Sequence, residues 1–293
     1  MMPKRRAPAH GQGLGTPVSL ALMALLVLLG AFVALGTASS AGVVGKATMR
    51  EGPRRVTLVN HMDETIWVAA SPGNAPANLT VTGWKLLTGH QVTITVPNHW
   101  NGRFWGRTGC HFDAAGIGSC QTGDCGDRFQ CNGFGAIPAT LVEYDLDAWD
   151  HLDFYDVSMV DGSNLPVYVN RFGGRGKDAI SASGCSAAGC TKAVICPRVL
   201  QLRAGRAVVG CISACGRFGT DEYCCRGKWS SRSACNPKLW PVDYAAVFKR
   251  AEPFAYSYAY DDATSVFTCD GDCNYRITFG LTPVGVKRPS SVK

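Results

Sequence analysis

Fourteen cysteines constrain the fold of this 293-residue chain most strongly, and all of them lie between Cys110 and Cys273. Three occur in the sixteen-residue stretch GIGSCQTGDCGDRFQC, residues 116–131. Such a stretch is compatible with a metal site, a redox site or a loop cross-linked by disulfides. These three cysteines lack CxxC spacing, and His111 is the only histidine nearby, which argues against zinc and thiol redox sites. The spacing therefore favours disulfides.

The N-terminal segment predicts export. Basic residues 4–6 precede an almost wholly apolar run over residues 18–35, which closes on small residues suited to cleavage after Ala38 or Ala41. The alternative is a retained signal anchor, since the apolar run is about as long as a membrane span. An even number of cysteines in an exported chain is typical of a disulfide framework. We therefore expect a secreted protein with a signal peptide over residues 1–41.

The charge of the exported part excludes one class of partner. Removal of residues 1–41 leaves 26 basic and 22 acidic residues, a net charge of +4, without a run of lysine or arginine. This argues against nucleic-acid binding, and a mildly cationic protein would adhere to anionic surfaces such as a microbial membrane. We expect no cofactor and no metal.

Strand-like alternation dominates the chain from Val56 onward. Only one good amphipathic helical window follows, over residues 241–251, and its opening proline suits a first helical turn. Short strands separated by Gly, Pro, Asn and Asp are typical of a β-sandwich rather than an α/β fold. The predicted strands are residues 55–61, 64–70, 90–97, 102–108, 164–172 and 274–282.

Several motifs carry a resemblance to a known family. The stretch GIGSCQTGDC, with another cysteine six residues on, resembles the signature of the thaumatin family. The segments WGRTGCHF, PATLVEYDL, DFYDVSMVDGSNLPV, EYCC, FKRAEPFAYSYAYDD and NYRITF resemble further family segments in the family's order, so the resemblance covers about residues 56–283. It implies a mainly β fold: a flattened antiparallel β-sandwich, a disulfide-rich lobe with a short helix, and a small disulfide-stapled loop lobe.

The resemblance also divides the chain into segments. The expected order is a signal peptide (1–41), sandwich (54–107), small lobe (108–138), sandwich (139–191), disulfide-rich lobe (192–252), sandwich (253–283) and polar tail (284–293).

The family's cysteine pattern implies most of the disulfide pairs. Two of its positions are filled by Met62 and Gly280, so the bridge between the terminal strands is absent, and Glu252 replaces the family partner of Cys190. Because Cys273 is unusual, we predict a rewired Cys190–Cys273 bridge. The other implied pairs are Cys110–Cys120, Cys125–Cys131, Cys185–Cys269, Cys196–Cys211, Cys215–Cys224 and Cys225–Cys235.

The resemblance implies a cleft between the sandwich and the disulfide-rich lobe, lined by one arginine and four acids. These fall on Arg103, Glu143, Asp156, Asp161 and Asp261, the last with Asp262 adjacent. Carboxylates accept hydrogen bonds from sugar hydroxyls and an arginine donates them, whereas acids gathered on one face repel each other and do not favour stability. Aromatic residues beside these motifs could stack on sugar rings or simply pack in the core: Phe104, Tyr144, Phe154, Tyr155, Tyr256, Tyr258 and Tyr260.

Three functions are compatible with these residues. The first is a monomeric defence protein that binds β-1,3-glucan or another microbial wall carbohydrate and acts against fungi. The second is a weak endo-β-1,3-glucanase, with Glu143 as the acid and Asp161 or Asp156 as base or nucleophile. The third is an inhibitor of foreign hydrolases.

Overall fold

The computed structural model describes residues 52–73, 79–174, 188–189, 192–271 and 273–280, all within one unit, Met49–Lys293. The predicted signal peptide (1–41), the polar tail (284–293), Cys185 and Cys190 lie outside the described residues. No helix in the described ranges is both long and apolar enough to cross a bilayer.

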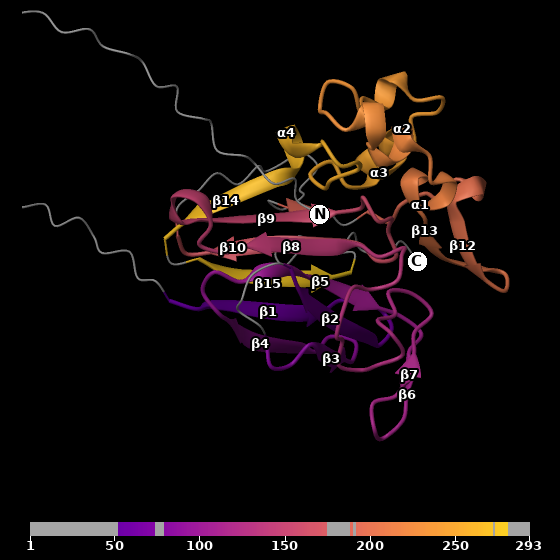
Figure 1. Cartoon of the computed structure of the whole chain (residues 1–293). Helices are drawn as coiled ribbons and strands as arrows, with labels where there is room; N and C mark the ends of the chain where they lie inside the picture. The colour runs from indigo at the N-terminus through magenta and orange to yellow at the C-terminus, as the bar shows by residue number, and fades with distance from the viewer. Residues whose placement is uncertain (1–51, 74–78, 175–187, 190–191, 272, 281–293) are drawn as a thin grey trace, which may run out of the picture. The chain divides into compact units, whose positions relative to one another are not determined.

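Two β-sheets form the body of this unit (Figure 1). Among the described residues, one sheet has five strands in the order β11-β10-β15-β1-β4, and the other has six in the order β14-β9-β8-β5-β2-β3. The five-stranded sheet consists of β1 (Arg54–Asn60), β4 (Gln91–Val96), β10 (Val167–Phe172), β11 (Ala188–Gly189) and β15 (Asn274–Phe279). The six-stranded sheet consists of β2 (Ile66–Pro72), β3 (Gly83–Leu86), β5 (Asn101–Arg107), β8 (Leu141–Asp145), β9 (Leu152–Ser158) and β14 (Val266–Asp270).

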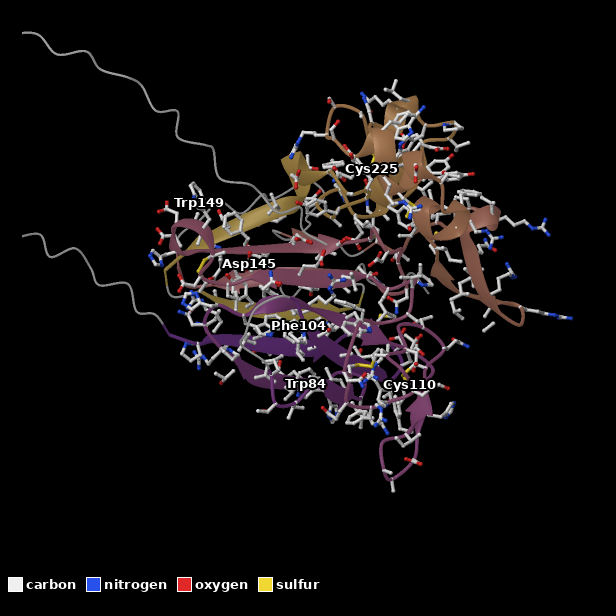
Figure 2. The ribbon with its side chains drawn as sticks, in the orientation of Figure 1. Trp84, Phe104, Cys110, Asp145, Trp149 and Cys225 are labelled. Atoms are coloured by element: carbon white, nitrogen blue, oxygen red, sulfur yellow. A yellow bond between two sulfur atoms is a disulfide. The ribbon has the colours of Figure 1, made fainter. Side chains whose placement is uncertain are left out.

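Both sheets contribute to one hydrophobic core. Alternate residues point inward because successive side chains of a strand face opposite sides. Val56 and Leu58 of the first sheet and Phe104 of the second all belong to the same buried cluster, and Phe104 is labelled in Figure 2. This packing confirms the predicted β-sandwich. Each of the six predicted strands overlaps an observed one, whereas β3, β8, β9, β11 and β14 of the two sheets were not predicted.

Strands β1 and β15, from the two ends of the described unit, pair in parallel. Their register runs from Val56 opposite Tyr275 to Asn60 opposite Phe279. Next to this ladder, the His61 amide donates a hydrogen bond to the Phe279 carbonyl. Backbone pairing therefore joins the terminal strands where this chain lacks the family's covalent bridge.

Two disulfide-bonded regions extend from the sandwich, marked in Figure 2 by Cys110 and Cys225. The small lobe (residues 108–138) carries β6 (His111–Phe112) and β7 (Gly118–Ser119), with disulfides Cys110–Cys120 and Cys125–Cys131. The helical lobe (residues 192–252) has disulfides Cys196–Cys211, Cys215–Cys224 and Cys225–Cys235. Its elements are η2 (Arg198–Leu200), β12 (Gln201–Ala204), β13 (Ala207–Cys211), α1 (Ala214–Phe218), α2 (Asp221–Cys224), η3 (Gly227–Trp229), η4 (Pro237–Leu239) and α3 (Ala245–Ala251).

The predicted helix over residues 241–251 is shorter than expected, since α3 begins at Ala245. Two other short helices lie beside the six-stranded sheet: η1 (Trp149–His151) between β8 and β9, and α4 (Asp262–Ser265) before β14.

The pairing expected for Cys269 and Cys273 is wrong. Sequence reasoning joined Cys269 to Cys185 and Cys273 to Cys190, but the structure bonds Cys269 to Cys273. These two residues flank the turn between β14 and β15, with Cα atoms 6.4 Å apart, so a local bridge forms without rearrangement of either strand.

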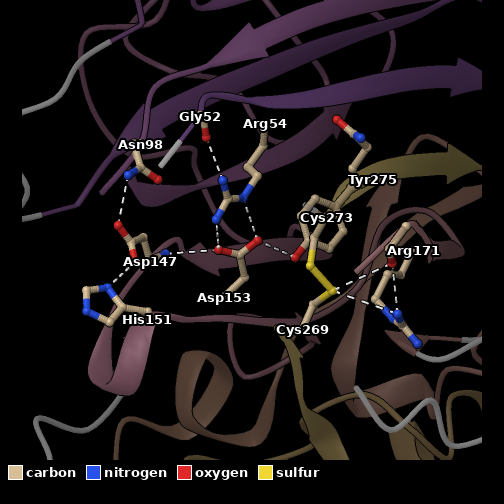
Figure 3. A network of polar contacts seen from close by, with 12 residues as sticks. Gly52, Arg54, Asn98, Asp147, His151, Asp153, Arg171, Cys269, Cys273 and Tyr275 are labelled. Atoms are coloured by element: carbon tan, nitrogen blue, oxygen red, sulfur yellow. Dashed lines mark hydrogen bonds and ion pairs between the residues drawn. A yellow bond between two sulfur atoms is a disulfide. The ribbon is translucent and has the colours of Figure 1, made fainter. Parts of the chain in front are cut away.

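A buried ion pair links the two sheets at one end of the sandwich (Figure 3). Arg54 of β1 donates to both carboxylate oxygens of Asp153 on β9, at 2.8 and 2.9 Å. The hydroxyl of Tyr275 on β15 donates to the same carboxylate at 2.7 Å, and so does the Asp147 amide at 2.9 Å. Three segments of the chain are thus tied to one acidic side chain.

Candidate functional site

Strand register brings three of the five predicted site residues into one row. Arg103 lies opposite Glu143 in the β5–β8 pair, and Glu143 lies opposite Asp156 in the β8–β9 pair. Directly opposed residues of neighbouring strands project from the same face of a sheet. Phe104, one residue from Arg103, faces the core, so the row lies on the opposite face of the sheet, outside the sandwich.

Arg103 connects this row to a fourth predicted residue. Its Nη2 lies 3.1 Å from Glu143 Oε1, and its Nη1 lies 4.0 Å from Asp161 Oδ2. The four residues Arg103, Glu143, Asp156 and Asp161 are called the acidic row below. Within it, Glu143 is buried while the Asp161 side chain keeps 44% of its surface exposed. The row therefore offers both an enclosed and an open carboxylate beside one guanidinium.

The helical lobe fixes the position of Asp161. The next residue, Gly162, has φ of +91°, and a Cβ atom there would lie 2.5 Å from the Cys211 carbonyl oxygen. Ser163 and Cys211 then exchange two backbone hydrogen bonds, of 2.8 and 2.7 Å. Since Cys211 is bonded to Cys196, the disulfide framework and this close backbone approach hold the Asp161 loop in place.

Asp156 differs from the other acids of the row. Its side chain has no exposed surface, and neither carboxyl oxygen has a hydrogen-bond partner among the described residues. Burial, followed by the negative charge of Glu143, raises the pKa of Asp156 well above its usual range. The site thus favours a neutral, protonated carboxyl group directly beside Glu143.

The fifth predicted residue, Asp261, makes its contacts elsewhere. Its Oδ2 accepts hydrogen bonds from Lys249 Nζ at 2.8 Å and from the Ser257 amide and hydroxyl at 3.0 and 2.8 Å. These contacts tie the segment before α4 to α3. An anchoring role accounts for all of them.

The neighbouring Asp262 is linked to the row instead. Its Oδ1 accepts a hydrogen bond from the Tyr256 hydroxyl at 2.7 Å, and its Oδ2 pairs with Arg232. The negative charge of Asp262 contributes to the raised pKa of Asp156. Tyr256 is itself fixed beside β9, because its amide donates to the Val157 carbonyl at 2.8 Å. Asp262 therefore lies within electrostatic range of the row.

The strand aromatics are packing residues. Phe104, Tyr144 and Tyr155 are fully buried between the sheets, and the rings of Tyr144 and Tyr155 both contact Tyr275. Tyr256 is 6% exposed, while Phe154, Tyr258 and Tyr260 are partly exposed. The alternation of a strand explains this result, because a residue next to an outward-facing acid must point inward.

Sequence reasoning missed one exposed ring at the site. The Arg103 guanidinium lies over the ring of Phe134, with Cζ 4.8 Å from the centroid, and Phe134 is 64% exposed. Phe134 belongs to the loop CNGFGAIP of the small lobe, where no periodicity marks it. A lone aromatic residue between two glycines in a polar loop is the signal that could have identified it.

The described residues contain no group of three or more histidine, cysteine or acidic side chains arranged to hold a metal ion. Two carboxylates of the row, Glu143 and Asp161, are joined through Arg103 instead. What they offer chemically is hydrogen bonding to hydroxyl groups and, at Glu143 and Asp156, two adjacent carboxyl groups in different environments.

Comparisons with known proteins cover most of the described unit. The model of the Thaumatin family matches residues 60–281, a segment that contains the whole acidic row. Pathogenesis-related protein 5 of Arabidopsis thaliana is 46% identical over 225 residues, which are 76% of this chain and 88% of that protein. Glucan endo-1,3-beta-glucosidase of Prunus avium is 42% identical over 229 residues, 76% of this chain and 89% of that protein. The solved structure of a thaumatin-like xylanase inhibitor covers 76% of this chain and 97% of its own, with 22% identity and a TM-score of 0.41.

Proposed function

The chain belongs to the thaumatin family, and on that premise we propose that it is a secreted defence protein that binds β-1,3-glucan or a related microbial wall polysaccharide through the acidic row. Antifungal activity is part of this proposal. The observation that carries it is the Arg103–Glu143–Asp156 row, built by strand register and extended to Asp161 by an ion pair. A rigid set of carboxylates on an outward sheet face has no evident stabilising role.

The chemistry of the row suits sugar hydroxyls. Glu143 and Asp161 accept hydrogen bonds from hydroxyl groups, and Arg103 donates them to hydroxyl and ring oxygens. The exposed face of Phe134 beside Arg103 provides a flat apolar surface on which a pyranose ring can lie. A glucan chain would thus meet polar groups on one side and an aromatic ring on the other.

Weak endo-β-1,3-glucanase activity is the second candidate, supported by the name of the Prunus avium relative. Hydrolysis needs a protonated carboxyl group near an ionised one. The raised pKa of Asp156 suits the protonated group, and the ion pair with Arg103 suits Glu143 to the ionised one. These roles are the reverse of those expected from sequence, where Glu143 is the acid. Because Asp156 has no exposed surface to meet a glycosidic oxygen, binding without hydrolysis is the first proposal.

The test measures binding to insoluble β-1,3-glucan and reducing-sugar release from soluble glucan, on wild type, Glu143→Gln and Asp161→Asn. We expect each variant to weaken binding about tenfold, the effect of losing a charged hydrogen bond. Asp221→Asn is the matched control, since Asp221 also pairs with an arginine but lies exposed in the helical lobe.

Each outcome of this test separates the candidates. Equal glucan binding by wild type, Glu143→Gln and Asp161→Asn would overturn the binding proposal. Sugar release that is present in wild type and lost in Glu143→Gln, with glucan still bound, would establish the enzyme. Absence of both binding and release in the wild type would exclude both functions for this polymer.

A further inference from the structure

A cavity of about 610 Å³ lies between the small lobe and strands β2 and β3 of the six-stranded sheet. Its lining includes Trp67 of β2, Lys85 of β3, and His111, Phe112, Arg128 and Phe129 of the small lobe. None of these residues belongs to the acidic row. This region is called the lobe cavity below.

Positive charge surrounds the lobe cavity. Lys85 and Arg128 are exposed at its edge, and Arg107, next to Phe112 and Phe129, is buried. The Arg107 guanidinium donates to the carbonyl oxygens of Trp67, Arg128 and Phe129, at 3.1, 2.7 and 2.8 Å. Burial lowers the pKa of Arg107 to about 10, so it remains charged at neutral pH. These carbonyl groups and Cys125 Sγ, which Nη1 approaches at 3.3 Å, are all uncharged, so no carboxylate in the described part of the chain neutralises Arg107 directly.

The acids near the cavity are engaged with backbone amides. Asp113 lines the cavity, and its Oδ1 accepts hydrogen bonds from the Ala115 and Ile117 amides at 2.9 and 2.8 Å. Asp124, whose charge acts on Arg107, accepts from the Cys120 and Asp127 amides at 2.9 and 3.0 Å. Two cations, Lys85 and Arg128, therefore line the cavity against one carboxylate, and the buried Arg107 behind them adds to a positive field in the cavity.

Aromatic rings complete the site. Lys85 Nζ lies 5.7 Å from the centroid of the Trp67 ring. Arg107 Cζ lies 5.3 Å from the Phe112 ring and 6.0 Å from the Phe129 ring, and these two rings contact each other edge to face. A partly exposed tryptophan with a lysine beside it can hold the face of a sugar ring while the cation pairs with an acidic substituent.

We propose that the lobe cavity is a second carbohydrate site, which binds an acidic saccharide chain bearing carboxylate or sulfate groups. Its chemistry is the opposite of the acidic row, which repels a polyanion. Both sites lie on the same face of the six-stranded sheet, because Trp67 is opposite Arg107 in the β2–β5 pair and Arg107 is four positions along β5 from Arg103. One sheet face thus presents an acidic site for neutral glucan and a basic site for an acidic chain.

The experiment compares Lys85→Ala/Arg128→Ala with the matched control Lys228→Ala/Arg206→Ala. Lys228 lies 5.5 Å from the ring of Trp229 and reproduces the Lys85–Trp67 pair, and Arg206 is exposed like Arg128, so both double variants lose two charges. Calorimetry on the full oxidised protein would measure binding of oligogalacturonate, dextran sulfate, neutral laminarin oligosaccharide and polyglutamate. All four altered side chains are exposed, and the melting temperature checks that each variant folds.

We expect the Lys85/Arg128 variant to bind the acidic saccharides at least about tenfold more weakly than wild type, since each lost charged hydrogen bond is worth about that factor. The control should match wild type, and laminarin binding should be the same in all three proteins. Comparison of oligogalacturonate with dextran sulfate identifies whether carboxylate or sulfate is preferred.

Several results would overturn the second site. These are wild-type affinity in the Lys85/Arg128 variant, an equal loss in the control, no binding of either acidic saccharide, or equal binding of polyglutamate. Glu143→Gln should leave acidic-saccharide binding intact, so failure of the glucan proposal is distinguishable from failure of this one.

Discussion

Two buried aspartates on β9 differ in the hydrogen-bond donors that surround them. Asp153 and Asp156 are three residues apart, and both have no exposed surface. They face opposite sides of the six-stranded sheet, since an odd number of residues separates them. Asp153 points between the sheets and receives hydrogen bonds from Arg54, Tyr275 and the Asp147 amide. Asp156 points outward beside Glu143 and receives none within the described residues.

The difference separates a buried acid that is held by hydrogen bonds from a buried acid that has none within the described residues. A buried carboxylate with a guanidinium partner and further donors is compensated for the loss of water. Without donors, the same group is driven toward its neutral form by burial and by neighbouring negative charge. The environment, and not the residue type or its strand, therefore decides which of the two aspartates contributes to the candidate site.

The largest change in the free energy of unfolding is expected from replacement of Asp153. Replacement Asp153→Ala leaves Arg54, which is 6% exposed, without its carboxylate, and removal of one partner of a buried ion pair costs about 3–5 kcal/mol. Urea unfolding of the oxidised protein measures this loss. Asp161→Asn is the control, because an exposed side chain should change stability by less than about 0.5 kcal/mol. A loss of stability below about 1 kcal/mol for Asp153→Ala would contradict the conclusion that the buried Arg54–Asp153 pair stabilises the fold.

The replacement Asp156→Asn should increase stability at neutral pH, whereas Asp153→Ala decreases it. Because the native pKa of Asp156 is raised, the native state binds a proton that the unfolded chain releases above about pH 4, so stability falls as pH rises from there toward the native pKa. Asparagine keeps the shape and removes this penalty. At pH 7 we expect the melting temperature to rise by several degrees, since about 1 kcal/mol corresponds to roughly 2–4 °C in a domain of this size.

The pH dependence of that gain is the decisive measurement. The gain in melting temperature of Asp156→Asn over wild type should shrink as pH falls and be absent near pH 4, where both states carry the proton. A gain that is constant between pH 4 and pH 7 would point to packing instead. A loss of stability at pH 7 would show that Asp156 has a compensating partner.

Sequence reasoning found the sandwich because strand alternation is a local property. The runs around Val56 and Ile94 each put apolar residues on one face, and both became strands of the core. The motif resemblance also predicted Arg103, Glu143 and Asp156 as candidate site residues, and the strand register places these three side by side.

Sequence could not distinguish among the acids. Asp153, Asp156 and Asp261 differ in their hydrogen-bond partners, and only the fold decides which donors reach them: Arg54, 99 residues away on β1, for Asp153, and Lys249 of α3 for Asp261. The Cys269–Cys273 bridge was missed for a different reason. Its spacing of four residues is local and readable, but the family's long-range pairing was carried over in preference to it.

A smaller effect on stability than at Asp153 is expected at Asp147, a buried acid whose hydrogen-bond partners come from a loop and from η1 instead of from strands. Asn98 Nδ2 donates to its Oδ2 at 2.8 Å, and His151 Nδ1 lies 2.9 Å from its Oδ1 (Figure 3). Burial alone would raise the pKa of Asp147, but these contacts and nearby His99 outweigh it, so the pKa is lowered. Replacement Asp147→Asn should cost about 1–2 kcal/mol at pH 7, the worth of one or two hydrogen bonds.

For a lowered pKa the stabilisation is present above the unfolded value near 4 and is lost as pH falls below it. Urea unfolding of Asp147→Asn and wild type at pH 7, 4 and 3 should therefore show a difference that narrows toward low pH, where wild-type Asp147 takes up a proton. The gain in stability of Asp156→Asn also disappears at low pH. At pH 7, however, Asp156→Asn is expected to be more stable than wild type and Asp147→Asn less stable, so the two differences shrink from opposite sides. If both variants shifted stability in the same direction at pH 7, the distinction between carboxylates with and without donors would fail.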